Sequence, residues 1–233
     1  MKKFGIIQPG RLGDIIILLP AAKYIADKGY TVYWPIFEDY VQMFSEVIDY
    51  VTFLPIKNNI YTGVYESYNI LRDVSVDRIV DVAATFPGSI CTEEYVRRGD
   101  GLGVIKFDEF KYELLDVPID EKWKLIFNRN KEKEEEIFKL YVGEHKEYIV
   151  KSLKYSGGEL PIELDANNVH VVEINDNHNI FYWIKILENA KVIALVESSM
   201  SNLVEQLNLQ NKKFLFRKPD NRTPVIRNKW KIK

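Results

Sequence analysis

Cysteine and histidine are almost missing from this chain, which has one cysteine, Cys91, and three histidines among 233 residues. A single thiol excludes an intramolecular disulfide framework and leaves no cysteine cluster for structural zinc. The three histidines, His145, His170 and His178, are scattered along the sequence and lack the neighbouring Cys or carboxylate residues of a metal site. We therefore expect no bound metal and no other cofactor.

Long hydrophobic runs are also absent. No apolar stretch approaches the roughly 18 residues that span a membrane. The N-terminal apolar residues 4–7 are ended by Gln8-Pro9-Gly10, so they are too short for the core of a signal peptide. The sequence predicts a soluble cytoplasmic protein, and a peripheral position at the inner membrane stays open.

Neither sign of charge dominates, because 32 Lys and Arg oppose 34 Asp and Glu for a net charge of −2. This balance disfavours nucleic acid as the main partner, since long nucleic-acid surfaces are basic. The C-terminal tail is nevertheless cationic, through Arg217, Lys218, Arg222, Arg227, Lys229, Lys231 and Lys233. It could contact an anionic ligand or be an ordinary solvated end.

What the chain does contain is an alternation of apolar strands and helical patterns. The run 4–7 reads as a buried strand, 14–28 as a helix ended by Gly29, and 30–34 as a strand, which makes a β-α-β unit. Pro20 predicts a kink or an early stop in that helix. The later segments are helices over 39–47 and 64–73 and strands over 50–55 and 78–82.

The alternation starts again after an irregular middle. Glycine and proline predict a surface loop over 85–105, and helices are expected over 107–115 and 131–141. The second series comprises strands over 148–153, 169–174, 191–196 and 213–216, with helices over 180–189 and 200–207. We predict an α/β protein with two parallel-sheet domains, 1–145 and 146–233.

The turn after the first strand has the sequence Gly10-Arg11-Leu12-Gly13-Asp14. Ligands of open α/β sheets bind at the carboxyl ends of strands, so this turn is a candidate site on geometric grounds. Gly10 and Gly13 would allow close approach of a substrate to the backbone. Asp14 could instead be only the N-cap of the helix that follows.

The longer string, residues 10–21 with Gly13-Asp14, five apolar residues and Pro20, resembles the start of family 9 glycosyltransferases, the bacterial heptosyltransferase group. The resemblance implies a GT-B fold, with two Rossmann-like domains facing across a cleft and the C-terminal one reduced. It also implies that Asp14 is the general base on an acceptor hydroxyl, with Gly10, Arg11 and Gly13 in the acceptor-side loop.

A second candidate site follows the strand 192–196, where small polar residues open a helix. Free amides at a helix start attract a diphosphate, although Ser198 or Ser199 could be a cap and nothing more. The segment resembles the family's Asp-Ser-Gly-x-x-His-Leu donor motif. Glu197, Ser198, Ser199 and Asn202 would then take the places of its Asp, Ser, Gly and His.

The strand 148–153 supplies a third candidate, because family members hold the donor phosphates at its end. Lys151, Ser152 and Lys154 match that place. The two lysines would face opposite sides of a strand, so we expect only one to contact the donor.

The resemblance implies a metal-independent inverting glycosyltransferase, heptosyltransferase-like or acting with a hexose, that moves sugar from a nucleotide-sugar to a glycan or lipid-linked glycan. Two alternatives remain open at this point. One is a degenerate relative that binds a nucleotide or glycan without turnover, because the donor motif is altered. The other is a glycosyltransferase that acts on nucleic acid.

Overall fold

The computed structural model describes residues 1–59, 61–83, 106–163, 169–217 and 224–233. The predicted loop over 85–105, with Cys91, lies outside these residues, as do Lys218 and Arg222. The chain divides into two compact units, Met1–Phe127 with Asn221–Ile226, and Asn128–Asp220 with Arg227–Lys233. The division falls at residue 127 and not near 145, because the helix over 131–141 packs on helices of the second unit.

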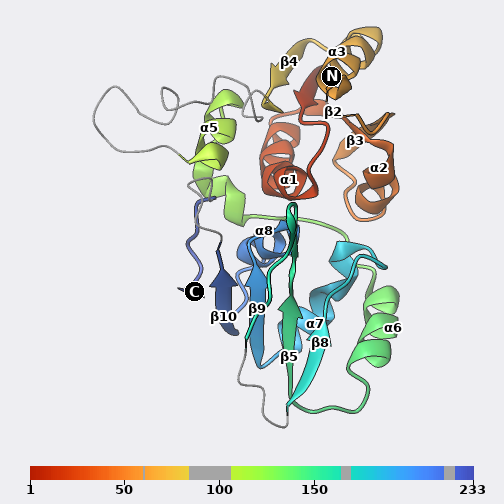
Figure 1. The fold of residues 1–233 in the computed structure, drawn as a ribbon. Coiled ribbons are helices and arrows are strands. Elements are labelled where there is room, and N and C mark those ends of the chain that lie inside the picture. The colour runs from red at the N-terminus through yellow and green to blue at the C-terminus, as the bar shows by residue number, and fades with distance from the viewer. Residues whose placement is uncertain (60, 84–105, 164–168, 218–223) are drawn as a thin grey trace, which may run out of the picture. The chain divides into compact units, whose positions relative to one another are not determined.

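The first unit has a parallel sheet of four strands in the order β3-β2-β1-β4 (Figure 1). Its strands are β1 (Lys2–Ile7), β2 (Tyr30–Phe37), β3 (Val51–Ile56) and β4 (Arg78–Asp81). Its helices are α1 (Leu12–Asp27), α2 (Glu38–Ser45), α3 (Gly63–Asp73) and α5 (Phe107–Leu114), followed by the 3-10 helix η2 (Ile119–Trp123). Every strand predicted for this half is confirmed.

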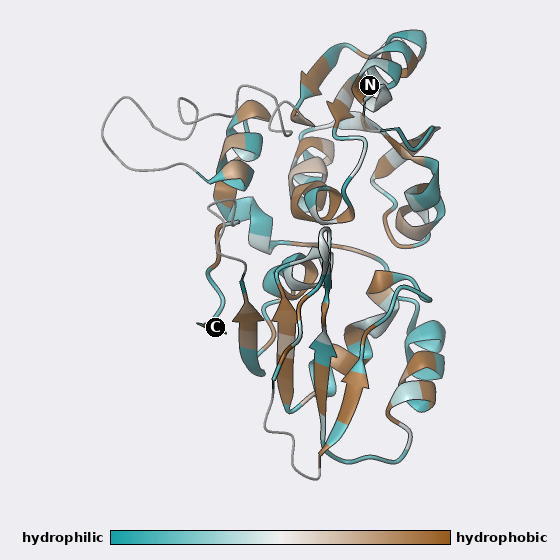
Figure 2. Ribbon diagram, viewed as in Figure 1, coloured by the Kyte–Doolittle hydropathy of each residue, from teal (hydrophilic) through white to brown (hydrophobic). Residues whose placement is uncertain are grey.

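Helix α1 is the core of the first unit. Ile15, Ile16, Ile17, Leu18 and Leu19 are all fully buried, so the first half of α1 is apolar on every side, as in a helix enclosed by other elements. Figure 2 shows this apolar helix.

Pro20 does not stop α1, so of the two outcomes predicted there, a kink or an early stop, the early stop is wrong. The helix continues to Asp27, and Gly29, at φ +89°, follows its end as expected. A proline in a helix interior removes one backbone hydrogen bond. The buried Tyr112 donates its hydroxyl to the Ile17 carbonyl at 2.8 Å, near the proline, so α1 gains a bond from α5.

The second unit has a parallel five-stranded sheet in the order β11-β10-β9-β5-β8. Its strands are β5 (Tyr148–Ser152), β8 (His170–Glu173), β9 (Val192–Val196), β10 (Lys212–Phe216) and β11 (Trp230–Ile232), and a small hairpin is formed by β6 (Lys154–Tyr155) and β7 (Gly158–Glu159). Its helices are α6 (Lys131–Tyr141), η3 (Ile180–Trp183), α7 (Ile184–Asn189) and α8 (Ser199–Gln206). The predicted strands are confirmed, and β11 and the hairpin are additional.

Two acids of this unit, Glu134 and Glu205, are buried and held by hydrogen bonds. Arg129 donates to both carboxylate oxygens of Glu134 in α6 and to both of Glu188 in α7. These bonds raise the pKa of Arg129 above its ordinary value. Glu205 in α8 accepts the backbone amide of Arg227 at 2.7 Å and the indole N–H of Trp230 at 2.7 Å. Glu134 therefore connects α6 to α7 through Arg129, and Glu205 connects α8 to the segment that contains β11.

Candidate functional site

The turn between β1 and α1 brings the first set of candidate residues to the carboxyl end of a central strand. Arg11 is exposed and has φ 61°, so the left-handed conformation in this turn belongs to Arg11 and not to Gly10 or Gly13. Gly10 is required for space, because a Cβ there would lie 2.2 Å from the Phe37 ring. Gly13 lies in the first turn of α1. The loop is pinned by the Phe37 amide, which donates to the Pro9 carbonyl at 2.8 Å.

Asp14 is not the helix cap. Helix α1 begins at Leu12 with Arg11 in the cap position, and the Asp14 amide already donates to the Arg11 carbonyl at 2.9 Å. The interpretation of Asp14 as an N-cap is therefore wrong. Its carboxylate remains in the first turn, where the helix dipole favours negative charge.

Asp14 is paired with a buried lysine that the sequence did not single out. The Nζ of Lys111 lies 3.3 Å from Oδ1 of Asp14, and the side chains are 1% and 16% exposed respectively. Lys111 also donates to the Gln8 side-chain carbonyl and, at 3.2 Å, to the Val82 carbonyl. A buried ammonium needs such partners, because leaving it uncompensated costs several kcal/mol.

Gln8 connects this lysine to the turn itself. Gln8 is fully buried, and its Nε2 donates to the Gly10 carbonyl at 2.9 Å. The indole of Trp34 donates to the Gln8 backbone carbonyl at 3.1 Å. The side-chain amide of Gln8 thus contacts the loop through its nitrogen and Lys111 through its oxygen. Lys111 in turn forms the ion pair with Asp14. One oxygen of the partly exposed Asp14 carboxylate therefore lies beside a buried ammonium, and such a contact helps to position a proton acceptor.

A weak signal for Lys111 does exist in the sequence. Asp108, Lys111, Tyr112 and Leu115 are spaced along one face of the α5 segment, and all four are buried. Asp108 is paired in turn with Lys122 of η2 at 2.5 Å, and both side chains are fully buried. Charged residues on an otherwise apolar helical face indicate a buried ion pair, but the pattern does not say which carboxylate each one meets.

The start of α8 holds the second set of candidate residues, after the carboxyl end of β9. The Ser201 hydroxyl accepts the Ser198 amide at 2.8 Å and donates to the Ser198 carbonyl at 2.8 Å. The Ser198 Oγ is buried and has no hydrogen-bond partner among the described residues. Ser199 is the first residue of the helix, and the Asn202 amide already bonds the Ser198 carbonyl at 3.1 Å. Ser198 is thus the N-cap residue of α8, and its Oγ is buried beside the helix start.

Glu197 at the same junction is not free. Its Oε2 lies 3.2 Å from Nε of Arg217, and both side chains are about one-quarter exposed. The pair places a guanidinium next to the helix start. Arg217 was assigned to the basic tail by the sequence, and no pattern linked it to this junction.

The lysines near the end of β5 are both paired with acids. The Nζ of Lys151 lies 2.7 Å from Glu173 on the neighbouring strand β8, and that of Lys154 lies 2.9 Å from Asp176. Ser152 between them is buried. The ammonium group of each lysine already pairs with a carboxylate, so a donor phosphate would have to compete with that carboxylate.

Within the residues that the structure describes, no group of three or more His, Cys, Asp or Glu side chains could hold a metal ion. Among their helices, none is both long and apolar enough to cross a membrane.

We compared the sequence and the structure with known proteins. No family model and no curated protein matches the sequence. Solved structures do match: a family 9 glycosyl transferase from Veillonella parvula has a TM-score of 0.62 at 9% identity, over 94% of this chain and 81% of that one. The E. coli ADP-heptose LPS heptosyltransferase II gives 0.59 at 11% identity, over 100% and 90%.

A third solved structure is E. coli heptosyltransferase WaaC with ADP-2-deoxy-2-fluoro heptose, which gives a TM-score of 0.54 at 13% identity, over 99% of this chain and 92% of that one. The matches to these three proteins cover 94–100% of this chain and 81–92% of theirs, so they share its fold. The α/β fold class and the structural resemblance to family 9 glycosyltransferases are thereby confirmed.

Proposed function

We propose that this protein is a metal-independent inverting glycosyltransferase in which Asp14 is the general base. The observation that carries the proposal is the fixed, partly exposed Asp14 carboxylate at the carboxyl end of β1, held by the buried Lys111. The structural relatives support it, because the two E. coli relatives above are named as heptosyltransferases and one of them was solved with an ADP-sugar analogue.

The reaction needs one base and one leaving group. The acceptor hydroxyl gives its proton to Asp14 while its oxygen bonds the anomeric carbon, and the bond from that carbon to the nucleoside diphosphate breaks. A single displacement of this kind inverts the anomeric centre. A positioned base contributes about 10²–10⁴-fold to such a step. We propose a glycan or lipid-linked glycan as the acceptor.

The donor would be held by the second unit. Free amides at the start of α8 and the Ser198 hydroxyl suit a diphosphate, and Arg217 adds a positive charge beside them. Ser199 and Asn202 belong to the same helix start. These groups would neutralise the leaving diphosphate, which is the task of the metal in metal-dependent transferases.

Lys151, Ser152 and Lys154 remain proposed donor contacts of lower rank, since both lysines already meet carboxylates. One of them would have to exchange its acid for a phosphate oxygen when the donor binds.

The first experiment identifies the donor. Thermal unfolding is measured with ADP-, GDP-, UDP- and CMP-linked sugars and with the free nucleotides. A ligand at 100 times its dissociation constant stabilises the native state by about 2.7 kcal/mol. Stabilisation by one nucleotide class, reduced in Ser198→Ala, supports the donor site; no stabilisation by any member contradicts it.

One observation favours the alternative function, binding of a nucleotide or glycan without turnover. The pairing of Glu197 with Arg217 occupies the position that would correspond to the family's aspartate, which favours a protein that binds a nucleotide or glycan without turnover. Release of nucleoside diphosphate from a bound nucleotide-sugar separates the two functions, because the binding protein would release none.

A further inference from the structure

One face of the second sheet has no helix on it in the described part of the chain. The crossovers from β8 to β9 and from β9 to β10 run in the same direction across the sheet. Right-handed connections therefore place η3, α7 and α8 on one face. The connection from β5 to β8 runs the other way and belongs to the opposite face, where its described residues form only the β6–β7 hairpin and extended chain. Figure 1 shows α7 and α8 behind the strands.

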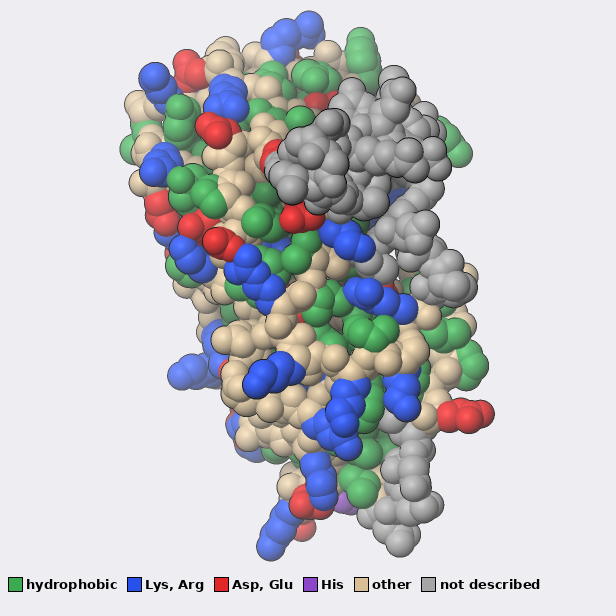
Figure 3. Space-filling model, turned by 90° about the vertical axis from the view of Figure 1, so that its left-hand side faces the viewer, with side chains coloured by type: hydrophobic (Ala, Val, Ile, Leu, Met, Phe, Trp, Pro, Cys, Tyr) green, Lys and Arg blue, Asp and Glu red, His purple; other side chains and the backbone are tan. Residues whose placement is uncertain are grey.

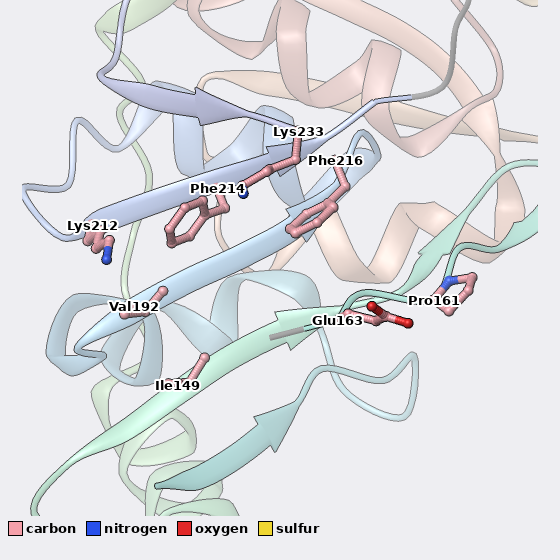
Figure 4. Close-up of a pocket in the computed structure, with 8 residues that line it drawn as sticks. All are labelled: Ile149, Pro161, Glu163, Val192, Lys212, Phe214, Phe216 and Lys233. Atoms are coloured by element: carbon pink, nitrogen blue, oxygen red, sulfur yellow. The ribbon is translucent and has the colours of Figure 1, made fainter. Parts of the chain in front are cut away.

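The uncovered face contains a concave cavity of about 570 Å³ (Figure 4). Its floor consists of Ile149 and Val192, which are neighbours in adjacent strands. Phe214 and Phe216 add two rings from one strand, and both are half-buried. Their spacing of two residues puts them on the same side, about 6.6 Å apart along β10. A wall of two rings over an apolar floor suits a flat apolar ligand group.

The rim of this cavity is cationic. Lys212 and Lys233 line it, and their Nζ atoms lie 5.1 and 5.9 Å from the centre of the Phe214 ring. Lys231 is the direct neighbour of Phe214 on β11 and shares its face. No carboxylate of the described chain pairs with these three lysines. Glu163 is the acid that lines the cavity.

The three rim lysines are not alone in this respect, because Lys131, Lys146, Lys213 and Lys229 of the second unit also have no ion pair with a described carboxylate. Six other lysines of this unit do form an ion pair with an acid: Lys133, Lys139, Lys151, Lys154, Lys185 and Lys191. The region 212–233 has nine Lys or Arg and one Asp, in a chain whose net charge is −2. Figure 3 views the molecule from the left-hand side of Figure 1, where β10 lies, and shows basic side chains spread over that surface. Such a local excess of positive charge attracts a polyanion.

We propose that this groove binds single-stranded nucleic acid, with bases against Phe214 and Phe216 and phosphates on Lys212, Lys231 and Lys233. Sheet-based RNA-binding modules stack bases on aromatic side chains of an open sheet face in the same manner. A membrane surface fits less well, because the rings line a concavity and do not protrude. The inference concerns the second unit alone and does not depend on glycosyl transfer.

The test is fluorescence anisotropy of labelled 12-mers of deoxythymidine and uridine against the full chain. Each stacked base is worth about 5- to 150-fold in affinity, so Phe216→Ala weakens binding by that factor. Phe216→Leu keeps an apolar side chain and still weakens binding, which separates loss of the ring from loss of the fold. Affinity must also fall with rising salt.

Charge variants give results of both signs. Lys212→Gln and Lys233→Gln weaken binding several-fold, Glu163→Gln strengthens it, and Lys191→Gln, whose lysine is paired with Glu147, leaves it unchanged. Three results overturn the proposal: no binding of either 12-mer, equal effects of Lys191→Gln and Lys212→Gln, or binding of thymidine monophosphate as tight as that of the 12-mer. If the 12-mers do not bind, binding of anionic vesicles would identify the groove as a membrane contact.

Discussion

Lys111 and Asp14 form an ion pair, with 3.3 Å between Nζ and Oδ1, in which the lysine is buried and the carboxylate is partly exposed. The lysine comes from α5 and the acid from the first turn of α1. The core of the first unit thus contains a buried ammonium whose contacts include the candidate base, Gln8 and Val82. We regard Lys111 as the residue that positions Asp14.

Replacing this lysine should impair the chemical step more than substrate binding. In Lys111→Met the Asp14 carboxylate loses the charge that fixes it, so we expect kcat to fall about 10-fold or more while KM for the donor stays near the wild-type value. The matched control is Lys124→Met, which removes an exposed lysine paired with Glu121 in the same unit. Equal kcat values for Lys111→Met and the control would show that the pair has no positioning role.

Ser198→Ala should separate ligand binding from stability. The Ser198 hydroxyl has no partner in the described residues, so its loss should change the free energy of unfolding by less than about 0.5 kcal/mol. Donor affinity should fall about 2- to 10-fold, the value of one hydrogen bond.

Ser201→Ala is the control, because the Ser201 hydroxyl bonds the Ser198 amide and carbonyl and its loss should destabilise α8. Isothermal titration and urea unfolding measure the two quantities. Unchanged donor affinity in Ser198→Ala would remove this hydroxyl from the donor site.

Arg129→Met should destabilise the second unit. The change removes the bonds to Glu134 and Glu188 and leaves Glu134, which is 2% exposed, without its guanidinium. Because Arg129 itself is partly exposed, we expect a loss of about 2 kcal/mol in urea unfolding.

Lys133→Met breaks only an exposed pair with Glu136 and should cost under about 1 kcal/mol. Adding Glu134→Leu to Arg129→Met should restore part of the loss, because no buried charge then remains unpaired. A double variant that is less stable than Arg129→Met alone would contradict the view that Arg129 stabilises the unit by pairing with the buried Glu134.

Chelation of metal should not affect transfer. The described residues contain no cluster for a metal ion, and the proposed donor site uses α8 and Arg217 to neutralise the diphosphate. Turnover measured with 10-fold excess EDTA over added divalent ions, against turnover in Mg²⁺ or Mn²⁺, should agree within experimental error. A loss of turnover in EDTA that Mn²⁺ restores would contradict metal independence.

The sequence was informative where a pattern is local. Strands such as 30–34 and 192–196 are short apolar runs beside turn residues, and Gly29 ends α1 as predicted. The turn of Gly10 to Asp14 could also be located, because β1 and α1 are adjacent in the chain. Its internal geometry could not: the cap is Arg11, and the space at Gly10 is set by Phe37 of β2.

The partners of the site residues could not be predicted, because they come from elements far along the chain. Lys111 reaches Asp14 and Gln8 only after α5 packs on α1, and Arg217 meets Glu197 only because β10 lies beside β9. Strand β11 was missed for the same reason, since Glu205 of α8 fixes the segment that contains it. Burial decides these contacts, and a single sequence shows no burial directly.

The most direct test of the central claim is the rate of nucleoside diphosphate release by the wild-type protein and by Asp14→Asn, with the donor that stabilises the protein and a glycan acceptor. Asparagine keeps the size of the side chain and cannot take up the acceptor proton. The account predicts a rate about 10²–10⁴-fold lower in the variant, with donor affinity unchanged. Turnover by Asp14→Asn at the wild-type rate would contradict it.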